Sequence, residues 1–167
     1  GEIAAEFGGG PFDWATKAED RTRLWEARHN GYWAGRALRP GADTLATDVC
    51  VPISQLADCV EETKRDIEAT GLIAPIAGHV GDGNFHTQPL LDLSDPEEVA
   101  RVQGFLDRLV KRALAMGGTC TGEHGVGQKK IKYLEAEHGA PALAVMRTLK
   151  RALDPQNILN PGKIVVL

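Results

Sequence analysis

Few cysteines, no long apolar run and no excess of basic residues limit what this chain can be. The three cysteines, Cys50, Cys59 and Cys120, are far apart and form no Cys-x-x-Cys pair, so reduced thiols in a cytosol-like compartment are the simpler interpretation. No apolar run approaches the roughly 20 residues needed to span a bilayer, and no signal peptide is visible. A net charge of -4 and a pI near 5.7 leave no basic stripe for a nucleic acid.

Several binding motifs are also missing. The chain has no Gly-x-Gly-x-x-Gly turn and no P-loop, so it offers no phosphate-binding loop for a dinucleotide. It lacks a His-Glu-x-x-His helix, the pattern that would support a metal-dependent hydrolase. It also lacks an initiator Met, and residues 2–7 have the character of a helix end stopped by three glycines. We therefore expect a fragment of a longer polypeptide, about one domain in length.

The segment HVGDGNFH, residues 79–86, places two imidazoles symmetrically about an Asp-Gly pair. Asp-Gly favours a two-residue hairpin turn, which would set His79 directly opposite His86. Directly opposed Cβ atoms lie about 4.5–5.5 Å apart, so the two rings could share one ion. The same spacing also suits a cross-strand pair bonded to solvent or carbonyl groups. The hairpin is therefore a candidate half of a metal site.

A second polar cluster follows later in the chain. The segment GEHGVG, residues 122–127, supplies the carboxylate of Glu123 and the imidazole of His124 among glycines. Glycine-rich loops allow the backbone to approach a ligand closely. This cluster strengthens the metal interpretation of the hairpin.

Periodicity predicts an α+β fold with helices packed mainly on one face of an antiparallel sheet. Ser54 is expected to cap one helix, and the charged residues of 128–137 are expected to form a solvated helix face. In the first helix, Arg28 lies among large apolar residues and is either a snorkelling side chain or a fork that binds a carboxylate. We expect helices over residues 20–38, 55–70, 96–116, 128–137 and 143–153, and strands over 47–52, 72–79, 84–91 and 119–121.

Five further segments are distinctive: LWEARHN (24–30), TDVCVP (47–52), GHVGDGNFH (78–86), GTCTGEHG (118–125) and LNPGK (159–163). Together they resemble the C-terminal portion of FAD-linked oxidases that act on D-2-hydroxy acids, a family that includes D-lactate, glycolate and D-2-hydroxyglutarate enzymes. The resemblance covers nearly the whole chain, and it implies a ferredoxin-like substrate domain for residues 1–167. It also implies a partner, an N-terminal FAD-binding domain that we expect to precede this fragment.

The resemblance also implies roles for individual residues. His79, His86 and Glu123 correspond to ligands of a divalent metal, zinc or manganese. His124 corresponds to the base that takes the substrate hydroxyl proton. Two further residues complete the set: Arg28 corresponds to the arginine that binds the substrate carboxylate, and Asn160 lies in the tail, residues 155–167, that approaches the flavin.

The implied activity is oxidation of a D-2-hydroxy acid, D-lactate first, to the 2-oxo acid with FAD as hydride acceptor. A glycolate- or D-2-hydroxyglutarate-type enzyme of the same family is an alternative, and so is a metal-binding or partner-docking module without catalysis. We expect the fragment alone to be inactive. Its expected location is cytoplasmic, peripheral to a membrane only through an electron-acceptor partner.

Overall fold

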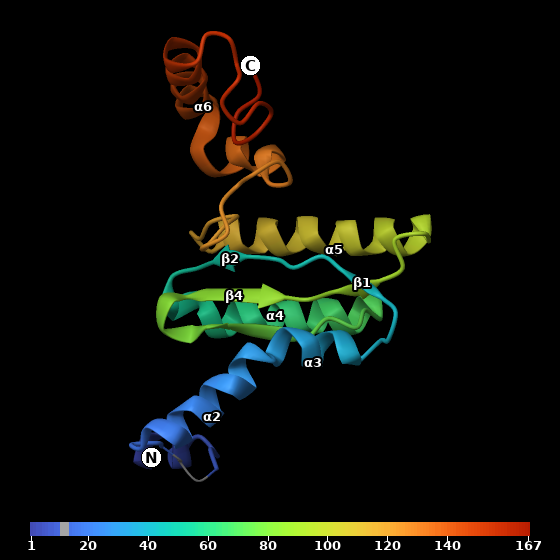
Figure 1. The fold of residues 1–167 in the computed structure, drawn as a ribbon, viewed down its shortest axis with the longest axis vertical. Coiled ribbons are helices and arrows are strands. Elements are labelled where there is room, and N and C mark those ends of the chain that lie inside the picture. The colour runs from blue at the N-terminus through green and yellow to red at the C-terminus, as the bar shows by residue number, and fades with distance from the viewer. Residues whose placement is uncertain (11–13) are drawn as a thin grey trace. The chain divides into compact units, whose positions relative to one another are not determined.

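The structure is a computed structural model that describes residues 1–10 and 14–167, and it divides the chain into two compact units, Gly1–Leu38 and Arg39–Leu167. The first unit contains the helices α1 (Glu2–Glu6), α2 (Ala18–His29) and α3 (Gly31–Ala37) (Figure 1). The single helix predicted over residues 20–38 is thus wrong, because the chain breaks it at Asn30. Asn and Gly in succession are weak helix formers, which explains the break.

The second unit is an α+β domain, as predicted. The elements of this unit are β1 (Asp43–Thr44), β2 (Val49–Cys50), α4 (Ile53–Thr70), β3 (Ile76–His79), the 3-10 helix η1 (Val80–Asp82), β4 (Asn84–Thr87), β5 (Leu90–Leu91), α5 (Pro96–Ala115), the 3-10 helix η2 (Ile131–Tyr133) and α6 (Leu134–Leu153).

The strands form an antiparallel sheet. Thr119 forms an antiparallel bridge with Cys50 in β2, so the strand order is the Thr119 segment, β2, β4 and β3, with α4 and α5 as crossovers. This is the ferredoxin-like βαββαβ arrangement. A second pair, β1 with β5, extends the sheet surface.

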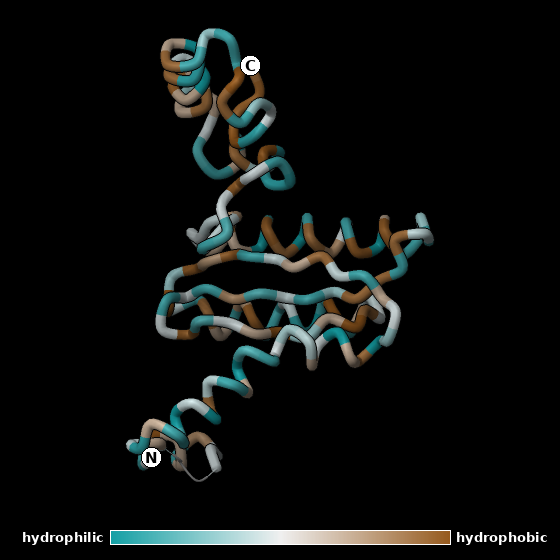
Figure 2. The backbone as a smooth tube through the Cα atoms, in the orientation of Figure 1, coloured by the Kyte–Doolittle hydropathy of each residue, from teal (hydrophilic) through white to brown (hydrophobic). Residues whose placement is uncertain are grey.

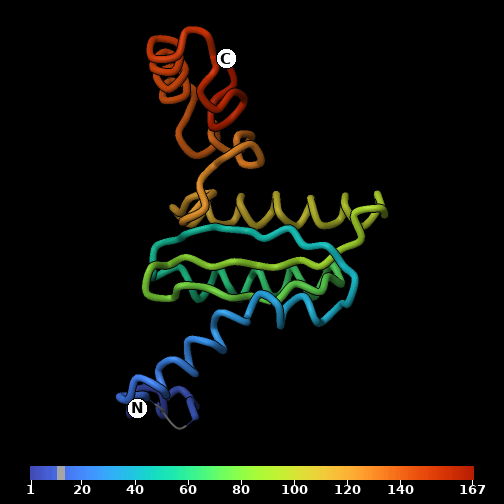
Figure 3. The backbone as a smooth tube through the Cα atoms, viewed as in Figure 1, coloured from blue at the N-terminus to red at the C-terminus, as the bar shows by residue number. Residues whose placement is uncertain are grey.

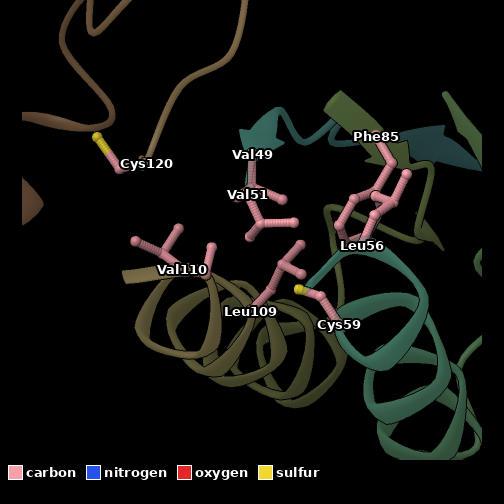
Figure 4. Packing of buried hydrophobic residues seen from close by; sticks show 9 residues of the cluster. Val49, Val51, Leu56, Cys59, Phe85, Leu109, Val110 and Cys120 are labelled. Carbon is pink, nitrogen blue, oxygen red and sulfur yellow. The ribbon is translucent and has the colours of Figure 1, made fainter. Parts of the chain in front are cut away.

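The helices α4 and α5 pack on one face of the sheet. Side chains from β2 and β4 meet side chains from both helices in one buried cluster, which includes Val49, Phe85, Leu56 and Leu109. Figure 4 shows Val49 and Val51 above Leu109, with Phe85 directed toward Leu56. Brown and teal stretches alternate along both helices in Figure 2, as expected for helices with one apolar side. The opposite face of β3 and β4 is therefore left for polar side chains.

The connection between β3 and β4 differs from the predicted two-residue turn. His79 pairs with Asn84, and Ala77 pairs with His86, so the two histidines are diagonal neighbours on one face rather than directly opposed. The backbone tube of Figure 3 shows β3 and β4 running side by side and joined at one end. The four residues 80–83 connect the strands, with Gly83 at φ 72°. A Cβ at Gly83 would lie 2.1 Å from the carbonyl oxygen of Val51. This close approach to a third strand explains why the turn is wider than its sequence indicates.

Other helix boundaries were predicted with mixed success. The start of α5 is confirmed, since the Asp95 side chain accepts hydrogen bonds from the N–H groups of Glu97 and Glu98. The cap predicted at Ser54 is wrong, because α4 begins at Ile53 and has no side-chain cap. The helix predicted over residues 128–137 is wrong in its first half, where turns and η2 precede α6. No helix among the described residues combines the length and apolar character needed to cross a membrane.

Candidate metal centre and neighbouring site residues

His79 and His86 lie on the face of the sheet that α4 and α5 leave uncovered. Successive side chains of a strand point to opposite faces, and Phe85 points into the core, so its neighbour His86 points away from it. His79 shares that face because it pairs with Asn84, two residues before His86. The two ring centroids are 5.8 Å apart. Adjacent residues of β4 thus serve different parts of the domain, because Phe85 points into the core and His86 points toward the candidate site on the opposite face.

Glu123 completes a cluster with these histidines. Its Oε1 atom lies 3.3 Å from Nε2 of His79 and 2.9 Å from Nε2 of His86, and one ligand atom from each residue lies within 4.8 Å of the others. Two ligands bound about 2.0–2.1 Å from a tetrahedral ion are about 3.3 Å apart. The two separations from Glu123 Oε1 are therefore close to the spacing of ligands that share one divalent ion.

The hydrogen bond of the other His86 nitrogen supports this fit. Nδ1 of His86 lies 2.9 Å from the carbonyl oxygen of Thr47, and a carbonyl oxygen only accepts, so Nδ1 carries the proton. In the neutral ring Nε2 then presents a lone pair to the Glu123 carboxylate 2.9 Å away. Two acceptors at this distance repel unless a cation or a proton lies between them. Metal-bound histidines commonly have such a carbonyl partner on the far nitrogen.

A buried carboxylate, Asp48, organises the loop that carries Glu123. Its Oδ2 atom accepts hydrogen bonds from the backbone N–H groups of residues 122, 123 and 124 at 2.9, 3.1 and 2.9 Å. It also accepts one from the Thr121 hydroxyl at 2.7 Å. Its Oδ1 atom accepts one from the Asn84 amide at 2.8 Å. Burial alone would raise the pKa of Asp48, but the hydrogen bonds from Thr121, His124 and Asn84 outweigh it and hold the pKa far below its usual value.

Lys130 is the cation that accompanies this buried carboxylate. Its Nζ atom donates to the backbone carbonyl of Asp48 at 2.7 Å and lies 3.3 Å from Oδ2. Only 17% of the Lys130 side chain is exposed. The prediction that the charges of residues 128–137 form a solvated helix face is therefore wrong for this lysine.

His124 lies beside the cluster but further from Glu123 than the two strand histidines. Its Nε2 atom is 3.6 Å from Oε1 of Glu123, and 64% of its side chain is exposed. Its ring centroid is 5.4 Å from that of His86. The third imidazole thus adjoins the candidate metal position and faces solvent, where a small substrate can reach it.

Of the two remaining predicted site residues, Arg28 belongs to the first unit and Asn160 to the second. Arg28 is exposed in α2 of the first unit, and its guanidinium carbon lies 5.3 Å from the centroid of the Trp25 ring. Asn160 has φ 47° and lines a cavity of about 610 Å³ together with residues 125–127 and 163–165. Residues 125–127, which line this cavity, follow His124 directly in the chain. Asn160 is therefore near the loop that carries His124, and the carboxylate-binding role of Arg28 stays a prediction.

Sequence reasoning assigned no role to Asp48, Thr121, Asn84 or Lys130. Asp48 lies in a stretch of β-branched residues, TDVCVP, which predicts a strand and contributes to the family resemblance but gives the acid no role of its own. An acid at the centre of such a stretch is itself a signal, since a buried charge requires partners. Its partners are 36 to 82 residues away, and their identity is not visible in the sequence.

Helices on one face of an antiparallel sheet, and two histidines with a glutamate on the other, define an α+β domain with a candidate divalent metal centre. Over residues 1–164 the chain matches the family model described as FAD linked oxidases, C-terminal domain. The chain belongs to this family of FAD-linked oxidoreductases, which confirms the resemblance noted in its sequence.

Curated relatives agree with this assignment. The chain is 53% identical over 166 residues to the probable mitochondrial D-lactate dehydrogenase of Danio rerio, covering 99% of this chain and 33% of the relative. It is 43% identical over 164 residues to the mitochondrial D-lactate dehydrogenase (cytochrome) of Arabidopsis thaliana, with coverage of 98% and 29%. It is 39% identical over 151 residues to the glycolate oxidase subunit GlcD of Bacillus subtilis, with coverage of 90% and 32%. The chain thus spans about a third of the length of these relatives.

A solved structure supports the fold alone. The 4-ethylphenol oxidase from Gulosibacter chungangensis, in its isoeugenol complex, superposes with a TM-score of 0.65 at 21% identity, covering 91% of this chain and 31% of that one. The ferredoxin-like α+β arrangement therefore recurs in another oxidase.

Proposed function

We propose that this chain is the substrate- and metal-binding part of a flavoprotein that oxidises a D-2-hydroxy acid, D-lactate first, to the 2-oxo acid. The convergence of His79, His86 and Glu123 beside His124 carries the proposal. Its relatives, named D-lactate dehydrogenases and a glycolate oxidase subunit, supply the substrate class. An N-terminal FAD-binding domain in the longer polypeptide would bind the flavin.

The residues divide the work as follows. His79, His86 and Glu123 would hold a divalent ion, zinc or manganese, and such an ion would supply a positive charge that lowers the pKa of the substrate hydroxyl. His124 accepts the hydroxyl proton at its exposed Nε2 atom. FAD, held by its own domain, would supply the acceptor for the C2 hydrogen and its electron pair. The substrate thus loses one proton and one hydride, and the C2 carbonyl forms.

Recognition of the substrate carboxylate falls to Arg28 in this proposal. A guanidinium group matches a carboxylate with two parallel N–H donors. Asn160, in the tail of residues 155–167, would contact the flavin. Arg28 would thus bind the carboxylate end of the substrate, and Asn160 would bind the cofactor.

A panel of acids tests the proposal in the full-length protein that carries this chain. D-lactate, L-lactate, glycolate and D-2-hydroxyglutarate are each supplied with an artificial electron-accepting dye, and dye reduction is followed. D-lactate should be oxidised fastest and L-lactate not at all. A flavin that no D-2-hydroxy acid reduces, in a protein that holds stoichiometric metal, would instead favour a metal-binding module without catalysis.

The location of the protein stays a prediction. Two of the relatives are named mitochondrial, whereas the reduced thiols led us to expect a cytoplasmic protein. Cys50, Cys59 and Cys120 are all free in the structure. Immunolocalisation of the full-length protein in its own cells decides between the two compartments.

A further inference from the structure

We propose that Asp48 is a positioning residue that fixes the loop of residues 121–124 and so orients Glu123 at the proposed metal site. This inference rests on the proposed metal site and names a residue that the ligand set does not include. The Asp48 side chain is only 2% exposed, and its carboxylate is already occupied by donors from the chain. It therefore acts through other residues rather than on the substrate.

Residues 121–124 are all bonded to a single carboxylate oxygen of Asp48. Four successive residues, 121 to 124, each donate to Oδ2 of Asp48, one through a hydroxyl and three through backbone N–H groups. Three successive N–H groups that point at one oxygen atom leave the backbone little freedom. The side chains of Glu123 and His124 therefore project from the loop in fixed directions. Without the carboxylate, these N–H groups would need other acceptors in a segment that has no regular secondary structure.

Asp48 is itself held in place by Lys130 and Asn84. Lys130 bonds to both its backbone carbonyl and its carboxylate, and Asn84 bonds to its carboxylate and to the carbonyl of Val49. Asn84 belongs to β4, two residues before His86. A Cβ at Gly122 would lie 2.0 Å from the Asn84 amide nitrogen. The loop thus packs directly on the strand that carries one of the ligands.

Thr47 and Asp48 together connect the two sides of the proposed metal site, His86 and Glu123. Thr47 accepts the hydrogen bond that orients His86, and the next residue, Asp48, accepts those that orient Glu123. One dipeptide therefore sets the 2.9 Å separation between Nε2 of His86 and Oε1 of Glu123. Outer partners of metal ligands typically change metal affinity by about 10–100-fold when they are replaced.

The test measures zinc affinity in the full-length protein, by competition between the metal-free protein and a chromophoric chelator. Asp48→Asn places an NH₂ group against donors and should raise the dissociation constant for zinc about 10–100-fold. Thr121→Val removes one of the hydrogen bonds and should raise it by less. Thr121→Ser keeps the hydroxyl and should restore it. The Thr121 pair decides the question if Asp48→Asn does not fold.

Asp66→Asn is the matched control. The Asp66 carboxylate is also mostly buried, and it pairs with Arg108 and Arg112 between α4 and α5. This variant should lower the melting temperature without changing zinc affinity. If Asp48→Asn and Thr121→Val lose stability but bind zinc as the wild type does, Asp48 is only structural and the inference fails. A wild-type protein that takes up neither zinc nor manganese would overturn the metal site itself, and the positioning role with it.

Discussion

The Nδ1 atom of His86 donates a hydrogen bond to the carbonyl oxygen of Thr47 across 2.9 Å, and this contact turns Nε2 toward Glu123. The orientation of the ring thus depends on backbone that precedes β2, not on the strand that carries the histidine. In consequence the candidate metal site combines three parts of the chain, the segment before β2, the pair of strands β3 and β4, and the loop after α5.

Replacing both strand histidines should remove the metal. We expect the full-length protein to contain one divalent ion per chain, and the double variant His79→Ala/His86→Ala to contain none, because a single carboxylate cannot hold it. Elemental analysis after dialysis measures the content. His138→Ala, which changes a histidine in α6, should retain the ion. Metal that persists in the double variant would place the ion elsewhere.

His124→Ala should slow the reaction and keep the metal. Removal of a general base typically costs about 10²–10⁴-fold in rate, and the His124 Nε2 atom is further from Glu123 Oε1 than either strand histidine is. Stopped-flow reduction of the flavin by D-lactate gives the rate, and elemental analysis gives the metal content. Loss of the ion, or an unchanged rate, would contradict the assignment of His124 as base.

Gly83→Ala should destabilise the fold by about 2–4 kcal/mol, since it combines a left-handed backbone with a clash. Gly83 has φ 72°, and an added Cβ would lie 2.1 Å from the Val51 carbonyl oxygen. Urea denaturation measures the change. Gly81→Ala, in the same connection, is the control because nothing lies within 4 Å of its added Cβ. Equal stability of the two variants would rule out the close approach.

Stability should fall at acidic pH through Asp66. Burial raises the pKa of this carboxyl, but hydrogen bonds from Arg108 and Arg112 outweigh it and lower the pKa. The stabilisation is therefore present above the ordinary carboxyl pKa of about 3.9 and is lost as the pH falls through the lowered value. Denaturation curves between neutral and acidic pH should show a shallower decline for Asp66→Asn than for wild type. Asp43→Asn, an exposed acid in β1, is the control.

The 167-residue chain expressed alone should be colourless and inert toward D-lactate with an artificial dye. It contains no phosphate-binding loop for a dinucleotide, and hydride transfer requires the substrate carbon within about 3–3.5 Å of its acceptor. Absorbance near the flavin bands and dye reduction measure both properties. Activity should appear only when an FAD-binding domain is supplied. A yellow chain with turnover of its own would contradict this division.

Local chemistry explains the parts of the fold that could be predicted. The start of α5 follows from Asp95, Pro96 and the acids after them, all within one helical turn. The face of β4 that carries His86 follows from alternation with Phe85. Such features depend on residues that are near one another in the sequence.

Contacts between distant segments explain what could not be predicted. The turn after His79 widens because Gly83 approaches the carbonyl of Val51, some 30 residues earlier. The role of Asp48 depends on donors in the loop after α5 and on Lys130. The candidate ligands were found through their motifs, whereas the residue that holds them together was not.

The alternation of Phe85 and His86 along β4 has a further consequence for change in this chain. Phe85 belongs to the core, and His86 belongs to the site. A slip of one residue in the pairing of β4 would exchange the two faces, so that an imidazole would enter the apolar interior and a phenyl ring would replace a ligand. The core packing of β4 and the candidate metal site would thus be lost in a single event. An insertion or deletion of one residue within β4 should therefore damage the core and the site together, whereas a substitution at one position changes the side chain on one face.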